Sequence, residues 1–333
     1  MTPRRILLVS PAFHGYWAAL AAALEHDGHE VTAHCYDRGD THRDRWRNAL
    51  AHRSIGASQR ERNRAEVTQR AITVLRETRP DVVLVVKGDA LNDGWWEALA
   101  SQDVPTVLWL YDELERLSYT LDQLKTIGPV LSYSPNDVAR LRDAGIDASL
   151  LPDGFDSLTA FTPRQSPAVN LVGARYRERE RIVRMLVSHG IELEAYGREW
   201  SNHPWDLLRT GRKRDPASVG LREVSRTDYY GVMAGSLATL NIHGDGHDGL
   251  SMRTFEAPGV GGLQLIDRPS VADFYEPGVE TLLYDTDAEL VDLIQRAARD
   301  TAWSNRIRAA GKARTLAEHT LIHRMREVTR KWD

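Results

Sequence analysis

The segment RTFEAPGVGGLQLID, residues 253–267, combines residue types that suit a nucleotide. Glu256 offers two carboxylate oxygens that only accept hydrogen bonds, and small residues, including Gly259 and Gly261, follow it before an apolar run. Glycine lets a backbone approach a ligand closely, and α/β proteins commonly hold ribose hydroxyls with an acidic side chain beside a glycine-rich turn. The segment therefore predicts a nucleotide-linked ligand, with Glu256 on the ribose. The alternative for Glu256 is a carboxylate that complements the dipole at a helix start.

Arginine side chains in and upstream of this segment suit the phosphates of such a ligand, because the guanidinium group is planar, always charged and matched to phosphate oxygens. Arg253 is one candidate, and its alternative is an ion pair with Glu256, three residues further on. A second region is GARYRERERI, residues 173–182, where glycine and several arginines stand between an expected strand and an expected helix. Most charges in such a run face water. The ligand-binding candidates here are Gly173, Arg175 and Arg181, with Gly197 at the end of the next expected strand.

Three further candidates lie in loops that follow expected strands. His243 and Asp248 belong to NIHGDGHDG, and His14 belongs to PAFHGYW. Ligands of open α/β folds bind beyond the carboxyl ends of the strands, so these side chains are candidates for catalysis. Neither histidine has a partner carboxylate that is visible in the sequence, and the alternative for each of the three is an ordinary loop residue.

The loop HGDGHD also raises the question of a metal site, because His243, Asp245, His247 and Asp248 offer nitrogen and oxygen ligands. The glycines of this loop argue against a preformed site, and we expect no metal. The sequence has no Walker-type loop, His-Glu-x-x-His helix or Cys-x-x-Cys pair, and VGARYR is not a dinucleotide-binding fingerprint. The absence of that fingerprint argues against hydride transfer.

The elements that must position these residues alternate between strand and helix along the chain, which predicts parallel sheets with crossover helices. The expected strands are ILLVS, VTAHCY, VVLVV, TVLWLY and VLSYS in the first half, and NLVG, ELEAYG, SLATLNI, LQLI and ETLLY in the second. A turn-rich stretch with two prolines, residues 153–167, separates the two series. We therefore predict an α/β fold of two Rossmann-like domains, residues 1–160 and 161–333.

Composition narrows the class of protein. The 333 residues are 42% hydrophobic and 27% charged with a net charge of −4, which is typical of a globular protein with no preference for nucleic acid. No apolar run approaches the roughly 20 residues that span a bilayer, and the apolar run at the start is too short for a signal peptide. The single cysteine, Cys35, excludes an internal disulfide. We expect a cytoplasmic protein, and leave a homodimer open.

The same sequence resembles a known family. The stretch LNIHGDGHDGLSMRTFEAPGVGGLQLID resembles the strand, variable loop, Arg, Phe-Glu-Ala and Gly of CgeB-like (spore-maturation type) proteins, which belong to the GT-B glycosyltransferases. DFYEPGVETLLYDTDAEL and EHTLIHR resemble the blocks that follow, and PDVVLVVKGDAL, VPTVLWLYDE and LLPDGFD look like N-terminal counterparts. The resemblance covers most of the chain. It implies a GT-B fold, with two Rossmann-like domains facing each other across a cleft and a terminal helix that crosses between them.

The resemblance also implies an activity, the transfer of a sugar from a nucleotide diphosphate-sugar donor to an acceptor. The second domain would hold the donor, and the first domain would hold a glycan or small-molecule acceptor. Asp248 and Glu256 resemble the pair of acids in retaining enzymes of this group, with Asp in the first place, which implies retention. The loop with His14 and Gly15 would approach the transferred sugar, and Trp17 would lie on the acceptor side. No metal and no cofactor are implied.

Two alternatives to a glycosyltransferase stay open at the level of the sequence. One is a nucleotide-sugar epimerase on the same two-domain plan, which would need an acid and a base in the cleft. The other is a non-catalytic protein that binds nucleotide sugars or assembles a spore or cell surface, an alternative that the Asp in place of Glu at residue 248 favours.

Overall fold

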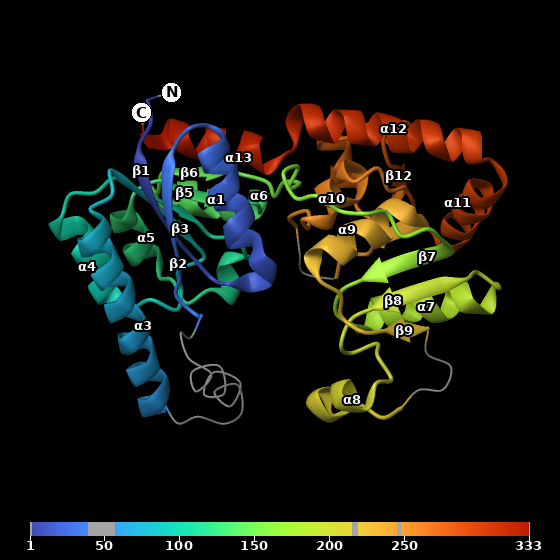
Figure 1. Cartoon of the computed structure of the whole chain (residues 1–333), viewed down its shortest axis with the longest axis horizontal. Coiled ribbons are helices and arrows are strands. Elements are labelled where there is room, and N and C mark those ends of the chain that lie inside the picture. Colours follow the sequence, from blue (N-terminus) through green and yellow to red (C-terminus); the bar gives the residue numbers. More distant parts are fainter. Residues whose placement is uncertain (1, 39–56, 215–218, 245–247, 333) are drawn as a thin grey trace. The chain divides into compact units, whose positions relative to one another are not determined.

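The computed structural model describes residues 2–38, 57–214, 219–244 and 248–332 (Figure 1). The chain divides into two compact units. Unit 1 contains Met1–Pro152 and Leu321–Asp333, and unit 2 contains Asp153–Thr320. The sequence predicts a division between residues 160 and 161, with the final helix in the second domain. The end of the chain lies in unit 1 because apolar residues of the last helix belong to its core.

Unit 1 is built on a six-stranded parallel sheet in the order β2-β1-β3-β4-β5-β6. Its strands are β1 (Arg5–Ser10), β2 (Glu30–Cys35), β3 (Val82–Val86), β4 (Thr106–Trp109), β5 (Val130–Ser132) and β6 (Ala148–Leu150). Every residue of β3, β4 and β5 is buried, as expected for apolar strands with both faces covered. Because β1 lies between β2 and β3, the chain winds outward in both directions from β1, which makes the β1–β3 boundary a topological switch point.

Helices cover both faces of this sheet. One face carries α3 (Ala57–Thr78), α4 (Asp93–Ser101), α5 (Leu121–Ile127) and α6 (Pro135–Asp143). The other face carries α1 (Tyr16–His26) and α13 (Leu321–Thr329), which precedes the short helix η4 (Arg330–Trp332). Leu321, Met325 and Val328 of α13 are buried in the same cluster as residues of α1 and β1. Arg326 on α13 holds Asp27 through two hydrogen bonds of 2.8 and 2.7 Å.

Unit 2 repeats the plan with the strand order β12-β11-β10-β7-β8-β9, again all parallel. Its strands are β7 (Ser166–Val172), β8 (Leu193–Tyr196), β9 (Gly220–Leu221), β10 (Ser236–Asn241), β11 (Gln264–Ile266) and β12 (Leu282–Leu283). The first strand, β7, lies between β8 and β10. The switch point of unit 2 is therefore the boundary between β7 and β10, where open α/β sheets bind their ligands.

The helices of unit 2 pack on both faces of its sheet. They are α7 (Arg177–Ser188), α9 (Arg226–Gly235), α10 (Arg253–Gly259), α11 (Asp287–Arg299) and α12 (Thr301–Glu318). The short helix α8 (Pro204–Thr210) lies between β8 and β9 in the chain. Residues of α7 and α11 share one core cluster, and residues of α9 and α10 share another. The two parallel sheets confirm the predicted α/β fold. In the described part of the chain, no helix has an apolar stretch long enough to cross a bilayer.

Candidate active site

The switch point of unit 2 brings two arginines against one glycine. Gly173 follows β7 directly and has a φ of +140°, a conformation that L side chains rarely adopt. A Cβ at this position would lie 2.7 Å from Nη1 of Arg179 and 3.2 Å from Nη2 of Arg253. Only glycine leaves room for both guanidinium groups beside the backbone here. Gly173 is among the ligand-binding residues predicted from the sequence, and Arg179 is not.

Arg179 is a buried cation with neutral partners. The residue is 8% exposed, and its Nε and Nη2 donate to the carbonyl oxygen of Ile242 at 3.1 and 2.8 Å. Its Nη1 donates to the carbonyl oxygen of Ala174 at 3.2 Å, and the ring centroid of Tyr176 lies 4.3 Å from its Cζ. Burial, followed by the nearby charge of Arg253, lowers the pKa of Arg179 to about 10. The side chain is still a cation at neutral pH.

Two further guanidinium groups lie at the same edge of the sheet. Arg253 opens α10 and donates to the carbonyl oxygen of Val172 and, at 3.4 Å, to Oδ1 of Asn241. Its Nε is buried without a hydrogen-bond partner. Arg268 follows β11 and donates to the carbonyl oxygen of Gly244 at 2.6 Å. Arg253 also forms a hydrogen bond with the side chain of Tyr229. Within the described ranges, the partners of these two arginines are therefore carbonyl, amide and hydroxyl oxygens, and no carboxylate in contact matches their positive charge.

His243 is held by Asp267, the last residue of the segment with which the sequence analysis began. Its backbone N–H donates to both carboxylate oxygens of Asp267, and its Nδ1 lies 2.9 Å from Oδ1. The backbone N–H of Ser251 donates to Nε2 at 3.3 Å, which makes Nδ1 the protonated nitrogen. Burial lowers the pKa of His243, and the hydrogen bond that its Nδ1 donates to Asp267 opposes that shift. A carboxylate partner for His243 is not visible in the sequence, and in the structure this partner is Asp267.

Glu256 lies in the first turn of α10 and is 1% exposed. Its Oε2 accepts a hydrogen bond of 2.9 Å from the hydroxyl of Tyr229, and its Oε1 accepts one of 3.1 Å from Tyr230. Both tyrosines belong to α9. Burial and then the charge of Glu256 raise the pKa of Tyr229. The structure thus places Glu256 at a helix start with protein hydroxyls on both oxygens, and its contact with ribose stays a prediction.

The glycines after Glu256 have protein neighbours. A Cβ on Gly259 would lie 2.5 Å from the ring of Phe155, and Gly261 has a φ of +83° just after α10 ends. Gly197, by contrast, belongs to the switch point, because its Cβ would lie 2.8 Å from the carbonyl oxygen of Gly173. The close approach that Gly259 permits is therefore to an aromatic ring of the same unit. Contact of Gly259 and Gly261 with a nucleotide-sugar stays a prediction.

The other two predicted arginines have carboxylate partners. Arg175 donates to Glu180 at 3.0 Å, and its guanidinium lies 5.2 Å from the ring centroid of Trp200. The half-exposed side chain of Arg181 pairs with Glu178 and Asp287 at 2.8 and 2.5 Å. Among the residues of α7, it is Arg179 rather than Arg181 that faces the switch point.

Asp248 is half-buried. It lies between His243 and Ser251, which are joined by the hydrogen bond from the Ser251 backbone N–H to Nε2 of His243. Asp245 and His247, the other residues considered as metal ligands, lie outside the described residues. Across the described ranges, no three His, Cys, Asp or Glu side chains form a group that could hold a metal ion.

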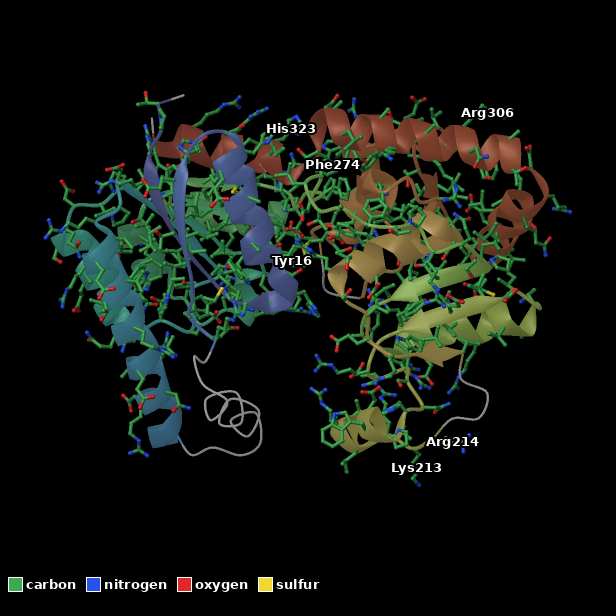
Figure 2. The ribbon with its side chains drawn as sticks, viewed as in Figure 1. Tyr16, Lys213, Arg214, Phe274, Arg306 and His323 are labelled. Atoms are coloured by element: carbon green, nitrogen blue, oxygen red, sulfur yellow. The ribbon has the colours of Figure 1, made fainter. Side chains whose placement is uncertain are left out.

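The candidates of unit 1 lie at the carboxyl end of β1. His14 has a φ of 44°, and Gly15 has a φ of 76°. His14 is exposed, and its ring lies 4.4 Å from that of Phe13. Tyr16 then opens α1 (Figure 2), and the ring of Trp17 lies 5.9 Å from the guanidinium carbon of Arg38.

Left-handed residues recur at this edge of unit 1. Lys87, after β3, has a φ of 62°, and Tyr111, shortly after β4, has a φ of 57°. Non-glycine residues in this conformation are strained and gather at functional sites. A non-glycine residue with a positive φ therefore follows each of three neighbouring strands, β1, β3 and β4. Of these three loops, only the one after β1, with His14 and Gly15, is predicted from the sequence to be functional.

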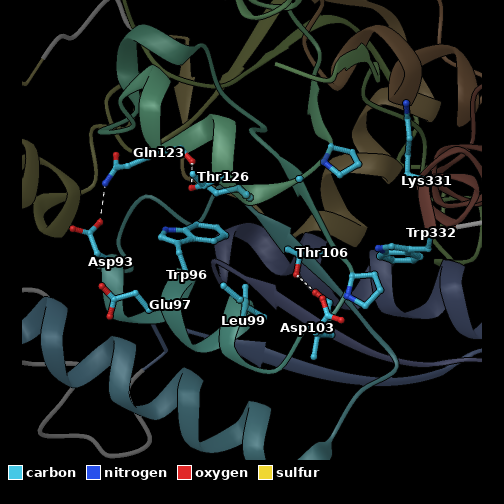
Figure 3. A pocket seen from close by; sticks show the side chains of 16 residues that line it. Asp93, Trp96, Glu97, Leu99, Asp103, Thr106, Gln123, Thr126, Lys331 and Trp332 are labelled. Carbon is cyan, nitrogen blue, oxygen red and sulfur yellow. Dashed lines mark hydrogen bonds between the residues drawn. The ribbon is translucent and has the colours of Figure 1, made fainter. Parts of the chain in front are cut away.

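A cavity of about 550 Å³ in unit 1 lies at the opposite edge of the sheet (Figure 3). It is bounded by Trp96 and Gln123 on two helices, by Pro105 and Pro129 before β4 and β5, and by Trp332 near the end of the chain. Because the cavity lies at the amino ends of these strands, it shares no residue with the predicted site.

The chain has similarity to a known sequence family and to solved structures. Residues 176–330 match the sequence profile of a family described as glycosyl transferase-like. No curated protein sequence matches the chain. The fold is similar to that of Anabaena HepE in complex with UDP and glucose, with a TM-score of 0.63, 15% identity and 99% of each chain covered.

Two other solved structures show the same likeness. Sucrose-phosphate synthase of Thermosynechococcus elongatus has a TM-score of 0.64 at 15% identity, with 99% of each chain covered. A Listeria monocytogenes protein proposed to be a UDP-N-acetylglucosamine 2-epimerase has a TM-score of 0.56 at 13% identity, with 94% of each chain covered. At these identities the likeness establishes the fold, and the predicted GT-B fold is confirmed. The fold alone does not separate a transferase from an epimerase.

Proposed function

We propose that the protein is a glycosyltransferase that binds a nucleotide diphosphate-sugar at the carboxyl ends of β7 and β10. The observation that carries this proposal is the group of Arg179, Arg253 and Arg268, whose contacts in the described part of the chain are with neutral oxygens. Keeping a buried cation without a counter-ion is costly. A diphosphate at the switch point would supply the missing negative charge, and guanidinium groups fit phosphate oxygens.

The same groups suit the chemistry of transfer. As the bond between the sugar and the diphosphate breaks, negative charge builds on the departing diphosphate. Arginines held in place by carbonyl contacts, such as Arg179 and Arg253, need no reorganisation to stabilise that charge. We therefore expect no metal and no cofactor. Glu256 would contact the ribose. Each of its carboxylate oxygens can accept more than one hydrogen bond, so the hydrogen bonds from Tyr229 and Tyr230 leave an acceptor site on each oxygen for a ribose hydroxyl.

The finer features of the proposal rest on the sequence resemblance. They are membership of the CgeB-like group, transfer with retention, and a glycan or small-molecule acceptor bound by unit 1. A cytoplasmic location is proposed from the composition. His14, His243 and Asp248 are the proposed catalytic residues, and Gly15 and Trp17 are the proposed acceptor-side residues.

A turnover assay separates this proposal from its alternatives. The purified chain is incubated with UDP-, GDP-, ADP- and CDP-sugars, with and without a panel of glycan and small-molecule acceptors. A transferase forms a glycosylated product only when an acceptor is present, and an epimerase changes the sugar of the donor without one. Tight binding of a nucleotide diphosphate with no turnover under any condition would point to the non-catalytic alternative. Retention is then read from the anomeric configuration of the product.

A further inference from the structure

The short helix α8 of unit 2 turns its apolar side to solvent. Trp205 is 56% exposed and Leu208 is 68% exposed. They are the two most exposed large hydrophobic residues in the described part of the chain, and their spacing of three places them on one side of the helix. On the inner side, Asp206 is 3% exposed and lies 3.1 Å from Arg222. The buried carboxylate fixes which side of α8 faces outward.

Exposed basic residues lie close to these two side chains in the sequence. Arg209 ends the exposed part of α8, and Lys213 and Arg214 follow the helix; all three are exposed. Figure 2 shows Lys213 and Arg214 at the end of unit 2 that carries α8, with α12 at the opposite end. We call the five exposed side chains, Trp205, Leu208, Arg209, Lys213 and Arg214, the α8 tip. The tip concentrates positive charge on a protein whose net charge is −4.

We propose that the α8 tip docks onto the surface of an anionic lipid bilayer. Tryptophan favours the boundary between water and lipid, where its ring is apolar and its N–H stays solvated. Basic side chains beside it are attracted to anionic head groups, and an apolar side flanked by basic residues is the pattern of interfacial helices. A soluble polyanion would use the charges but would leave Leu208 in water, so the combination favours a bilayer. The inference is independent of the proposed transfer reaction.

Vesicle flotation of the full chain, without any nucleotide sugar, tests the proposal. Vesicles contain either phosphatidylcholine alone or phosphatidylcholine and phosphatidylglycerol in equal amounts. We expect binding to the anionic vesicles only, and weaker binding as salt is raised, because salt screens exposed charges.

Two sets of substitutions separate the apolar and the basic contributions. Trp205→Ala with Leu208→Ala should weaken binding roughly 10- to 100-fold, through loss of apolar burial. Arg209→Gln with Lys213→Gln and Arg214→Gln should weaken it about 100-fold, since each basic residue near an anionic surface contributes about fivefold. All five side chains are exposed, so these variants should keep the wild-type circular dichroism and melting temperature.

Matched controls come from exposed residues elsewhere in unit 2. Leu158→Ala with Val279→Ala removes apolar groups of comparable exposure, 43% and 46%. Arg299→Gln with Arg306→Gln and Lys312→Gln removes the same charge from α11 and α12. Binding that falls equally in the controls, equal binding to neutral vesicles, or no binding to either kind would overturn the proposal. So would binding to heparin that survives Trp205→Ala with Leu208→Ala while vesicles are ignored, which would identify a soluble polyanion as the partner.

Discussion

Replacing Arg179 by Met tests the charge assignment at the switch point most directly. Methionine has a similar length and no charge. If Arg179 is kept for a ligand, Arg179→Met should impair nucleotide diphosphate binding and leave the free protein intact. If Arg179 is a structural group, the substitution should destabilise the protein and leave the affinity of the surviving folded fraction unchanged.

The structure sets the expected magnitudes. A guanidinium has five N–H donors, and three N–H···O contacts of Arg179 are with Ile242 and Ala174. Donors remain for phosphate oxygens, and one hydrogen bond to a charged group contributes about 1.5–3 kcal/mol, so the affinity for UDP should fall roughly 10- to 100-fold. Stability should change little, because a buried unpaired charge is removed and Tyr176 still donates to Ile242 at 2.6 Å. A shift of the melting temperature within about 4 °C corresponds to roughly 1 kcal/mol in a domain of this size.

The measurement is calorimetric titration with UDP, UMP and uridine, together with a thermal melt. The loss should be larger for UDP than for uridine, because only the phosphates meet the guanidinium. Arg181→Met is the matched control, two residues along the same helix and exposed in an ion pair with Asp287; its UDP affinity should equal that of the wild type. A melt lowered by much more than 4 °C with an unchanged UDP affinity would refute the reasoning.

Three further predictions concern neighbouring groups. Glu256→Gln keeps the shape of the side chain but removes its charge, so donor affinity should fall roughly 10- to 100-fold in calorimetry, and an unchanged affinity would remove Glu256 from the site. Transfer activity should survive excess EDTA; activity that is lost and then returns with one divalent ion would restore the HGDGHD loop as a metal site. Because burial lowers the pKa of His243, the unfolded chain binds more protons than the folded one below the unfolded value of about 6.5. The free energy of unfolding should therefore fall as the pH drops through that value, with a smaller slope in His243→Gln, and equal slopes from urea melts would contradict this.

The strands could be read from the sequence because local patterns determine them. VVLVV and TVLWLY are continuous apolar runs, and the structure buries all of β3 and β4. Arg179 could have been found in the same way. Together with Ile182, Val183 and Leu186 it forms the buried stripe of α7, at the helical spacing of an inward face. A charge on such a stripe faces the interior, whereas Arg181 lies off it.

Other features depend on contacts between distant parts of the chain. Asp267 reaches His243 because β11 lies beside β10 in the sheet, and the strand order is not visible in either local sequence. Gly259 packs on the ring of Phe155, about a hundred residues earlier. From the local sequence alone, a glycine at this position is equally consistent with close approach to a ligand and with packing against an aromatic ring. The tyrosine hydroxyls on Glu256 come from another helix, α9. Such pairings follow from the tertiary structure and not from residue type and spacing.

The return of α13 to unit 1 has a consequence for the order in which the protein is made. Residues 1–152 leave the ribosome first, yet one face of their sheet is completed by Leu321, Met325 and Val328. At about 5–20 residues per second, synthesis of unit 2 takes on the order of ten to thirty seconds. During that interval the nascent unit 1 lacks the side chains of α13 that cover this apolar surface in the folded protein. A stop codon before residue 321 would therefore damage unit 1, even though residues 1–152 would be present in full.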